Sequence, residues 1–131
     1  MIKKIERTTS IRQKSRDTIE AVKTAARIAD EKKAEYIKIL DMRSRLAITD
    51  YFLIISARNT RLTRRIEEEI RLNLKNKGKH PLNVSGQSEG NWILIDYDDF
   101  VIHIFTEELR EYYQLEKLWR DSKEIKWNQR K

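Results

Sequence analysis

Two neighbouring stretches in which every second residue is apolar predict a β-hairpin over residues 91–105. A spacing of two places the apolar side chains on one face of a pleated ribbon. These positions are Ile93, Ile95, Tyr97, Phe100, Ile102 and Ile104. With Asp98-Asp99 as the turn, Ile95 pairs with Ile102 and Ile93 with Ile104. The other face is mixed and carries Trp92, Leu94, Asp96, Val101, His103 and Phe105.

Directly after the hairpin the apolar spacing changes to three or four, which predicts a helix. Thr106 is suited to cap it. Glu107 and Glu108 follow in the first turn, where negative charge favours the positive end of the helix dipole. The apolar positions at this spacing are Leu109, Tyr112, Leu115, Leu118 and Trp119. Beyond Gln114 we expect either helix or an ordered tail.

The first predicted helix begins at Asp17, which forms a capping-box-like pair with Glu20. Its apolar stripe consists of Ile19, Val22, Ala25, Ala26 and Ala29, and the small alanines predict close packing on a sheet. Residues 1–16 are polar and basic without periodicity. We interpret them as a flexible arm, the alternative being an arm that becomes ordered against phosphate.

The middle of the chain predicts two strands, a helix and a third, short strand. Residues 36–40 form the first strand, and the nearly continuous apolar run 51–56 is typical of a central strand buried on both faces. Asn59 or Thr60 caps the helix. Its apolar stripe is Leu62, Ile66, Ile70 and Leu74, and it ends at Gly78, before Pro81. Residues 82–84 read as an edge strand, and the chain after Trp119 as a mobile basic tail.

This order of elements predicts an α+β fold of two layers with a mixed sheet of about five strands. A chain of 131 residues favours one domain, which we place at residues 17–120. Residues 1–16 and 121–131 would flank it as basic arms. The longest apolar run is too short to cross a bilayer, and the N-terminal residues lack the apolar segment of a secretory signal. We therefore expect no membrane contact and a cytoplasmic location.

The charge distribution separates basic from aromatic segments. The net charge is +7, but residues 80–119 carry two basic and eight acidic side chains and most of the aromatic rings. The basic residues gather in the two arms and in residues 58–79. A nucleic-acid-binding surface usually combines aromatic rings with basic side chains. The acidic aromatic segment indicates instead a basic protein partner.

Catalytic and metal-binding patterns are weak. The chain has no cysteine, three glycines and two histidines, which excludes thiolate sites and glycine-rich phosphate loops. Asp96 and His103 lie diagonally across the hairpin, where pairing within the sheet outweighs a catalytic dyad without an identifiable nucleophile. Asp41 and Asp50, at strand ends, leave a Mg²⁺ site as an alternative. We predict no enzyme activity, no cofactor and no metal.

Several short segments, in order and spacing, carry a resemblance to a known family. They are residues 36–41 (YIKILD), 44–52 (SRLAITDYF), 57–61 (ARNTR), 81–82 (PL), 86–92 (GQSEGNW), 96–99 (DYDD), 101–105 (VIHIF) and 110–119 (REYYQLEKLW). Over residues 17–120 the chain resembles the ribosomal silencing factor family, also called Iojap-like. It departs from the family at Asp98 and Ala57, where glycine is common.

The resemblance implies a compact α+β domain that is nucleotidyltransferase-like in outline but lacks the catalytic signature. It implies that the protein binds the large ribosomal subunit through ribosomal protein L14, at the face where the subunits join. It would block joining sterically and repress translation during starvation, with a further role in ribosome biogenesis. The alternatives are an RNA-binding assembly factor and a metal-dependent nucleotidyltransferase-like enzyme.

Candidate contact residues follow from the charge map together with the resemblance. For the protein partner they are Glu89, Trp92, Asp96, His103, Tyr112, Glu116, Leu118 and Trp119. For ribosomal RNA they are Arg61, Arg64, Arg65 and Arg71. Which aromatic rings belong to the surface and which to the core stays open, Trp119 above all. Self-association of the free protein into a homodimer through its aromatic surface is also open.

Overall fold

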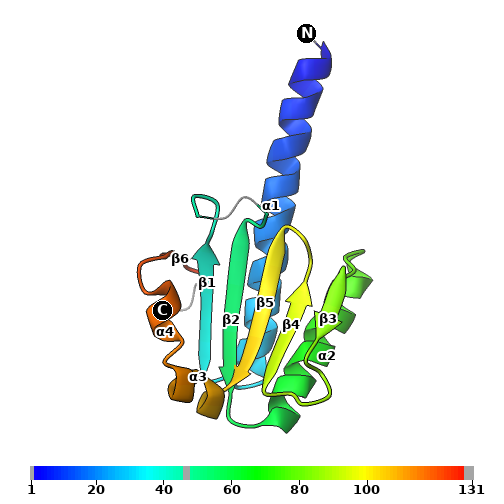
Figure 1. The fold of residues 1–131 in the computed structure, drawn as a ribbon. Helices are drawn as coiled ribbons and strands as arrows, with labels where there is room; N and C mark the ends of the chain where they lie inside the picture. Colours follow the sequence, from blue (N-terminus) through cyan, green and yellow to red (C-terminus); the bar gives the residue numbers. More distant parts are fainter. Residues whose placement is uncertain (1, 46–47, 129–131) are drawn as a thin grey trace.

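A computed structural model describes residues 2–45 and 48–128, and side chains at Lys14 and from Arg16 onward. Residues 1, 46–47 and 129–131, parts of the predicted arm, connection and tail, lie outside the described residues. The elements are α1 (Ile2–Glu31), β1 (Tyr36–Asp41), β2 (Tyr51–Ala57), α2 (Thr60–Asn76), β3 (Asn83–Ser85), β4 (Trp92–Asp96), β5 (Phe100–Thr106), α3 (Glu107–Tyr113), α4 (Glu116–Trp119) and β6 (Lys123–Ile125) (Figure 1).

The strands form one mixed sheet in the order β3-β4-β5-β2-β1-β6. The central strands β2 and β5 are parallel, and every other neighbouring pair is antiparallel. The α+β class and the mixed sheet are therefore confirmed, with six strands instead of about five. β2 is central and β3 lies at one edge, as predicted.

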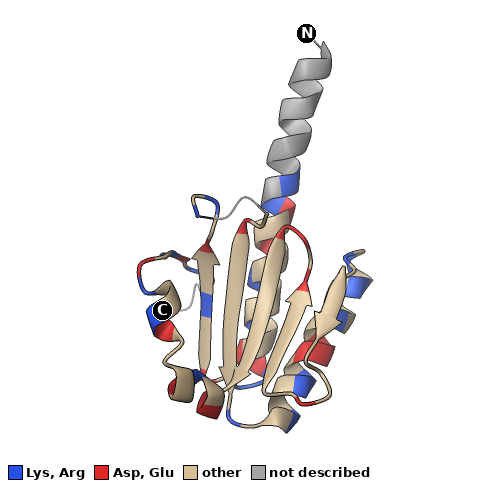
Figure 2. Cartoon of the chain, in the orientation of Figure 1, with Lys and Arg blue, Asp and Glu red and all other residues tan. Residues whose placement is uncertain are grey.

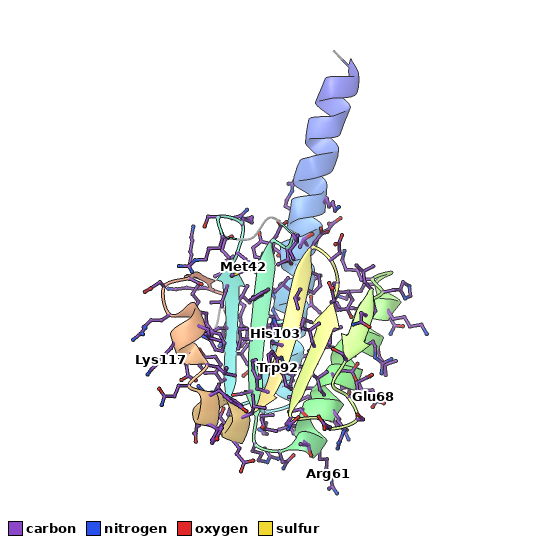
Figure 3. The ribbon with its side chains drawn as sticks, viewed as in Figure 1. Met42, Arg61, Glu68, Trp92, His103 and Lys117 are labelled. Carbon is purple, nitrogen blue, oxygen red and sulfur yellow. The ribbon has the colours of Figure 1, made fainter. Side chains whose placement is uncertain are left out.

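The helices cover the two faces of the sheet unequally. The long helices α1 and α2 pack on one face, whereas the short α3–α4 segment lies at the β1 side of the other (Figure 1). Figure 2 shows that charged residues gather on the helices and at strand ends, and β2 and β5 contain none. In Figure 3, His103 and Trp92 lie over the sheet on the side away from α1. This second face is the less covered one.

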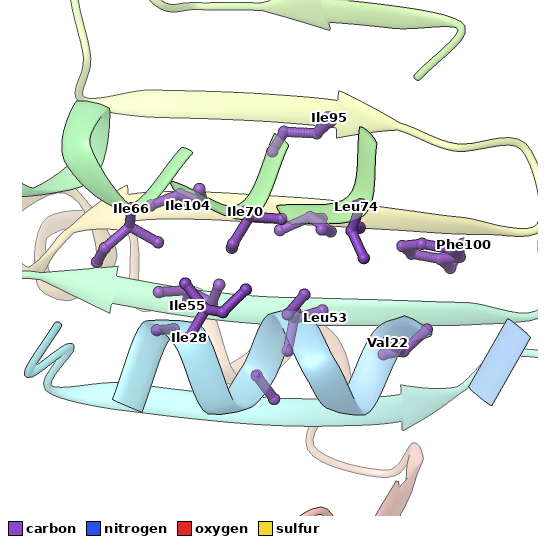
Figure 4. Packing of buried hydrophobic residues seen from close by; sticks show 14 of the residues in the cluster. Val22, Ile28, Leu53, Ile55, Ile66, Ile70, Leu74, Ile95, Phe100 and Ile104 are labelled. Atoms are coloured by element: carbon purple, nitrogen blue, oxygen red, sulfur yellow. The ribbon is translucent and has the colours of Figure 1, made fainter. Parts of the chain in front are cut away.

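The main core lies between the sheet and the helices α1 and α2 (Figure 4). The hairpin isoleucines face it and pair as predicted, Ile93 with Ile104 and Ile95 with Ile102. From α1, Ala25, Ala26 and Ala29 are fully buried, because side chains this small let the helix approach the sheet closely. From α2, the fully buried stripe is Ile66, Ile70 and Leu74. The alternating and helical spacings thus identified the core correctly.

The predicted turn and caps are present. The hairpin closes with the N–H of Tyr97 donating to the carbonyl of Phe100 at 2.9 Å. Asp98 takes the left-handed region at φ +75°, which a short polar side chain tolerates better than most and glycine tolerates best. Aspartate can therefore stand at this turn position without a glycine. Asn59 caps α2 by accepting from the N–H of Leu62 at 2.9 Å, and Thr106 caps α3.

The prediction that the first helix begins at Asp17 is wrong. Helix α1 already begins at Ile2, so Asp17 lies within it (Figure 1). Residues 2–16 contain no glycine or proline and several strong helix formers, so nothing in them stops a helix that tertiary packing fixes downstream. The division of the chain into arms and a domain at residues 17 and 120 stays a prediction.

The prediction of a mobile tail directly after Trp119 is also wrong. Residues 123–125 form β6, which pairs antiparallel with β1 and adds an edge to the sheet. Ile125 lies opposite Ile39, and Trp127 is half-buried against the main core. A three-residue strand has too short a pattern to be recognised without its neighbour, and the exposed edge of β1 supplies the hydrogen-bonding groups that order it.

Removing the α2 cap tests the local basis of this fold. We expect Asn59→Ala to lower the free energy of unfolding by about 1 kcal/mol, because one N–H of the first turn loses its acceptor. Asn73→Ala, in the exposed interior of the same helix, is the matched control and should leave stability unchanged or slightly raised. Urea unfolding measures both. Equal effects of the two substitutions would contradict the cap.

Candidate functional site

The less covered face of the sheet carries a cluster of rings around His103, at the middle of β5. His103 lies beside Ile54 of β2 and Leu94 of β4. The ring of Phe52 meets it edge-on with centroids 4.8 Å apart, and Phe105 lies 6.0 Å away on the same strand. We call the surface formed by Phe52, Trp92, His103 and Phe105 the aromatic face. Its rings come from three adjacent strands, which fix it rigidly.

Trp92 is the most exposed ring of the aromatic face. Its indole N–H donates to Nδ1 of His103 at 3.3 Å, and its ring lies 5.2 Å from that of Phe105. Even so, 48% of Trp92 remains exposed. A large apolar ring held in place on one side and open to water on the other is typical of a binding anchor.

The hydrogen bond from Trp92 also fixes the protonation of His103. Because Nδ1 accepts, the neutral ring carries its proton on Nε2, which is buried and has no hydrogen-bond partner within the described residues. Burial lowers the pKa of His103 from 6.5 to about 4. The ring is therefore neutral at physiological pH. The Oδ1 atom of Asp96 accepts from the N–H of Asp98 at 2.8 Å, so each member of the conceivable Asp–His dyad has another partner.

A groove of about 150 Å³ separates the aromatic face from the α3–α4 segment. The residues that line it are Met42, Arg45, Phe52, Ile54, Trp92, His103, Phe105, Leu115, Leu118, Trp119 and Ser122. Trp119 forms its inner wall and is only 8% exposed, with its N–H donating to the hydroxyl of Tyr36 at 3.0 Å. Leu118 stands at its rim, 74% exposed. The groove is thus a largely apolar surface feature with a rigid floor.

Arg110 holds the α3–α4 segment in place. Its guanidinium pairs with Glu107, Nη2 to Oε1 at 2.5 Å, and with Glu116, and it lies 4.3 Å from the ring centre of Tyr36. Burial by itself would raise the pKa of Glu107, but hydrogen bonds from Arg110 and Ser56 outweigh burial and lower it. Tyr36 in turn holds Trp119, so a single arginine connects both short helices to β1.

The predicted partner residues divide into three groups. The exposed ones are Glu89, Trp92, Tyr112 and Leu118. The partly buried ones are Asp96, His103 and Glu116. Trp119 is buried, so it supports the groove from inside and presents little surface to a partner. Phe52, Tyr36 and Arg110 were missed; the apolar alternation of β1 and β2 and the three-residue spacing from Glu107 to Arg110 were the available signals.

The structure separates the four arginines predicted to contact RNA into two pairs. Arg64 donates to three backbone carbonyls of residues 87–89, and Arg71 pairs with Glu67 at 2.6 Å. Arg61 and Arg65 are exposed, and no ion pair or hydrogen bond is described for either. Of the four, only Arg61 and Arg65 have guanidinium groups without a described ion pair or hydrogen bond.

The alternative Mg²⁺ site is not supported. Both carboxylate oxygens of Asp41 accept from the Arg43 guanidinium, at 2.9 and 2.7 Å, which also lowers the pKa of Asp41. Among the side chains that the structure describes, no three histidines or carboxylates are placed to hold a metal ion. No helix within residues 2–45 and 48–128 is both long and apolar enough to cross a membrane.

Burial of His103 makes stability depend on pH. The folded pKa lies below the unfolded value, so the contribution is complete above pH 6.5 and is lost as pH falls toward 4. Between pH 7 and pH 5 we expect wild type to lose about 2 kcal/mol more than His103→Gln. His80→Gln, at the exposed second histidine, is the control and should behave as wild type. Urea unfolding at both pH values measures this; an equal loss in His103→Gln would contradict it.

Three comparisons with known proteins agree with one another. The sequence profile of the family described as ribosomal silencing factor during starvation matches residues 15–131. A ribosomal silencing factor of Bacillus subtilis is 38% identical over 101 residues, covering 77% of this chain and 86% of the relative. A mouse relative named mitochondrial assembly of ribosomal large subunit protein 1 is 30% identical, covering 68% of this chain and 40% of the relative.

The fold agrees as well. The crystal structure of a protein from Chromobacterium violaceum superimposes with a TM-score of 0.73 at 25% sequence identity, covering 79% of this chain and 87% of the other. The family match over residues 15–131 contains all six strands and the aromatic face. The chain belongs to the ribosomal silencing factor family.

Proposed function

We propose that this protein binds the large ribosomal subunit through ribosomal protein L14 and sterically blocks joining of the small subunit, which represses translation. Family membership supports association with ribosomes. The observation that carries the proposal further is the aromatic face: a rigid, largely apolar surface with a half-exposed tryptophan at its edge. Such surfaces are typical of protein–protein interfaces.

Trp92 and Leu118 are the anchors in this proposal. They stand on opposite sides of the groove. When a partner binds, both side chains together would bury a large apolar area away from water. Tyr112, 77% exposed on α3, extends the surface. His103 and Trp119 hold the anchors from beneath: His103 accepts the indole proton of Trp92, and Trp119 packs at the groove wall. Interface energy usually concentrates in a few such residues.

Charge complementarity determines the kind of partner. The elements around the aromatic face carry Glu89, Asp96 and the glutamates of α3 and α4, alongside the cations Arg45, Arg110 and Lys117. In this proposal the exposed carboxylates of that mixed rim meet the partner. A ribosomal protein is basic, and opposite charges at the rim of an interface accelerate encounter and select the partner. Glu116 is paired with Arg110 and contributes less charge than its exposed neighbours.

The mechanism requires no chemistry. A protein of 15.8 kDa held at the surface where the subunits meet occupies space that the small subunit needs. At the two places considered for chemistry the polar atoms have other partners: Nδ1 of His103 accepts from Trp92, and both oxygens of Asp41 accept from Arg43. Repression then follows from occupancy alone and reverses on dissociation.

A role in assembly of the large subunit is the second candidate. The name of the mouse relative supports it, as do the unengaged Arg61 and Arg65 on α2, which in this proposal contact ribosomal RNA. The α2 surface lies on the opposite side of the sheet from the aromatic face, so a partner contact through one leaves the other accessible.

Truncating the anchor tests the first proposal. We expect Trp92→Ala to weaken binding to isolated large subunits by about 2 kcal/mol, roughly thirtyfold. It should also restore subunit joining in the same gradients. Leu72→Ala removes a comparably exposed apolar side chain (45%) from α2 and should bind as wild type. Co-sedimentation with separate large and small subunits is the measurement. A folded Trp92→Ala protein that binds undiminished would refute the assignment.

Salt dependence tests the RNA contact. Each lost phosphate contact lowers the slope of log affinity against log salt by about 0.7–0.9. We expect Arg61→Gln combined with Arg65→Gln to reduce the slope by about 1.5. Lys75→Gln with Lys77→Gln removes the same charge from the far end of α2 and should not change it. Identical slopes for all three proteins would exclude the contact.

A further inference from the structure

The loop between β3 and β4 lacks regular structure, yet five consecutive carbonyls in it have partners. Residues 87–89 bond to Arg64, Gly90 bonds to Thr63, and Asn91 bonds to the N–H of Thr106. Loop carbonyls are ordinarily left to water. Here two adjacent side chains of α2 satisfy four of them.

Arg64 makes the largest contribution. Its Nε donates to the carbonyl of Gln87 at 2.9 Å, and one terminal nitrogen donates to Ser88 at 2.7 Å and Glu89 at 3.2 Å. The planar guanidinium can reach three carbonyls at once because its donors point in fixed, divergent directions. A lysine ammonium at the same position has one nitrogen and cannot span them.

The end of the loop is pressed against α2. Thr63 Oγ1 donates to the carbonyl of Gly90 at 2.5 Å. A Cβ on Gly90 would lie 3.1 Å from Thr60 Cβ and 3.2 Å from Arg64 Cζ, and its φ of +79° also favours glycine. Gly90 therefore permits the close approach on which the Arg64 contacts depend.

The loop leads directly into the aromatic face. Trp92 is the second residue after Gly90, and the carbonyl of Asn91 between them accepts from Thr106, the N-cap of α3, at 3.1 Å. At the start of the loop, a Cβ on Gly86 would lie 2.0 Å from the carbonyl oxygen of Trp92. The backbone of Trp92 thus packs closely against the start of the loop that Arg64 contacts.

We propose that Arg64 is a positioning residue for the docking surface: it orders the 86–91 loop from α2 and thereby presents Trp92 and Glu89 to the partner. The inference rests on the function proposed above. The sequence predicted that Arg64 contacts RNA, because it lies among basic neighbours. The present proposal gives it a different role. Arg65, the adjacent arginine on α2, is the natural comparison because it carries the same charge without these contacts.

Hydrogen exchange of the free protein tests the loop directly, without a ribosome. In Arg64→Lys we expect the amide protons of Gly90 and Thr106, which bond within and against the loop, to exchange about tenfold faster. The amide of Ile102 in the core of β5 should keep its rate, and Arg65→Lys should match wild type throughout. Unchanged exchange at Gly90 and Thr106 in Arg64→Lys overturns the proposal, as does an equal acceleration of Ile102, which would indicate general destabilisation.

A double-mutant cycle tests the connection to binding. Arg64→Lys keeps the charge, so a phosphate contact would survive, whereas a disordered loop should weaken large-subunit binding about tenfold. In a Trp92→Ala background the same substitution should cost less than about twofold, because the main anchor that it positions is gone and only Glu89 remains. Equal costs in both backgrounds overturn the proposal. Undiminished binding by Trp92→Ala alone refutes the anchor assignment instead, and the exchange experiment then decides the loop's role separately.

Discussion

The structure depends on one imbalance: a six-stranded sheet has two apolar faces, and the chain supplies long helices for only one of them. Helices α1 and α2 bury the isoleucine-rich face completely. The other face receives only two short helices at its β1 side, so the rings of Phe52, Trp92 and His103 are left partly open to water. Exposed apolar surface that is rigid and bordered by charge is tolerated in water only as a limited patch. Covering it with a partner lowers the free energy of the system.

Two arginines hold this open face in shape from opposite sides. Arg110 ties the α3–α4 segment to β1 through two glutamates and the ring of Tyr36. Arg64 reaches from α2 around the end of the sheet to the loop that precedes Trp92. In both cases a planar cation with several donors binds several partners at once. A surface ordered before binding loses less conformational entropy when the partner arrives.

The charged residues around the aromatic face differ from those exposed on α2. Residues of both signs border the aromatic face, the glutamates of α3 and α4 together with Arg45, Arg110 and Lys117, whereas the unengaged arginines lie on α2. His103, the one titratable ring at the centre of the face, is kept neutral by burial. In the proposed function, binding to this face would therefore not depend on protonation of His103 at physiological pH.

The sequence by itself determined the features that depend on near neighbours. The alternation of apolar and polar residues predicted the hairpin and its pairing, and the helical spacing predicted the buried stripe of α2. Asn59 and Thr106 identified two helix starts. Each of these signals lies within a few residues of the chain. The start of α1 and the strand β6 were missed, since tertiary contacts with distant elements decide them. Only the tertiary structure shows that Trp119 is buried, that Trp92 is exposed and that Arg64 donates hydrogen bonds to the 86–91 loop. Burial and hydrogen-bond partners come from segments far apart in the chain, and no local pattern records them.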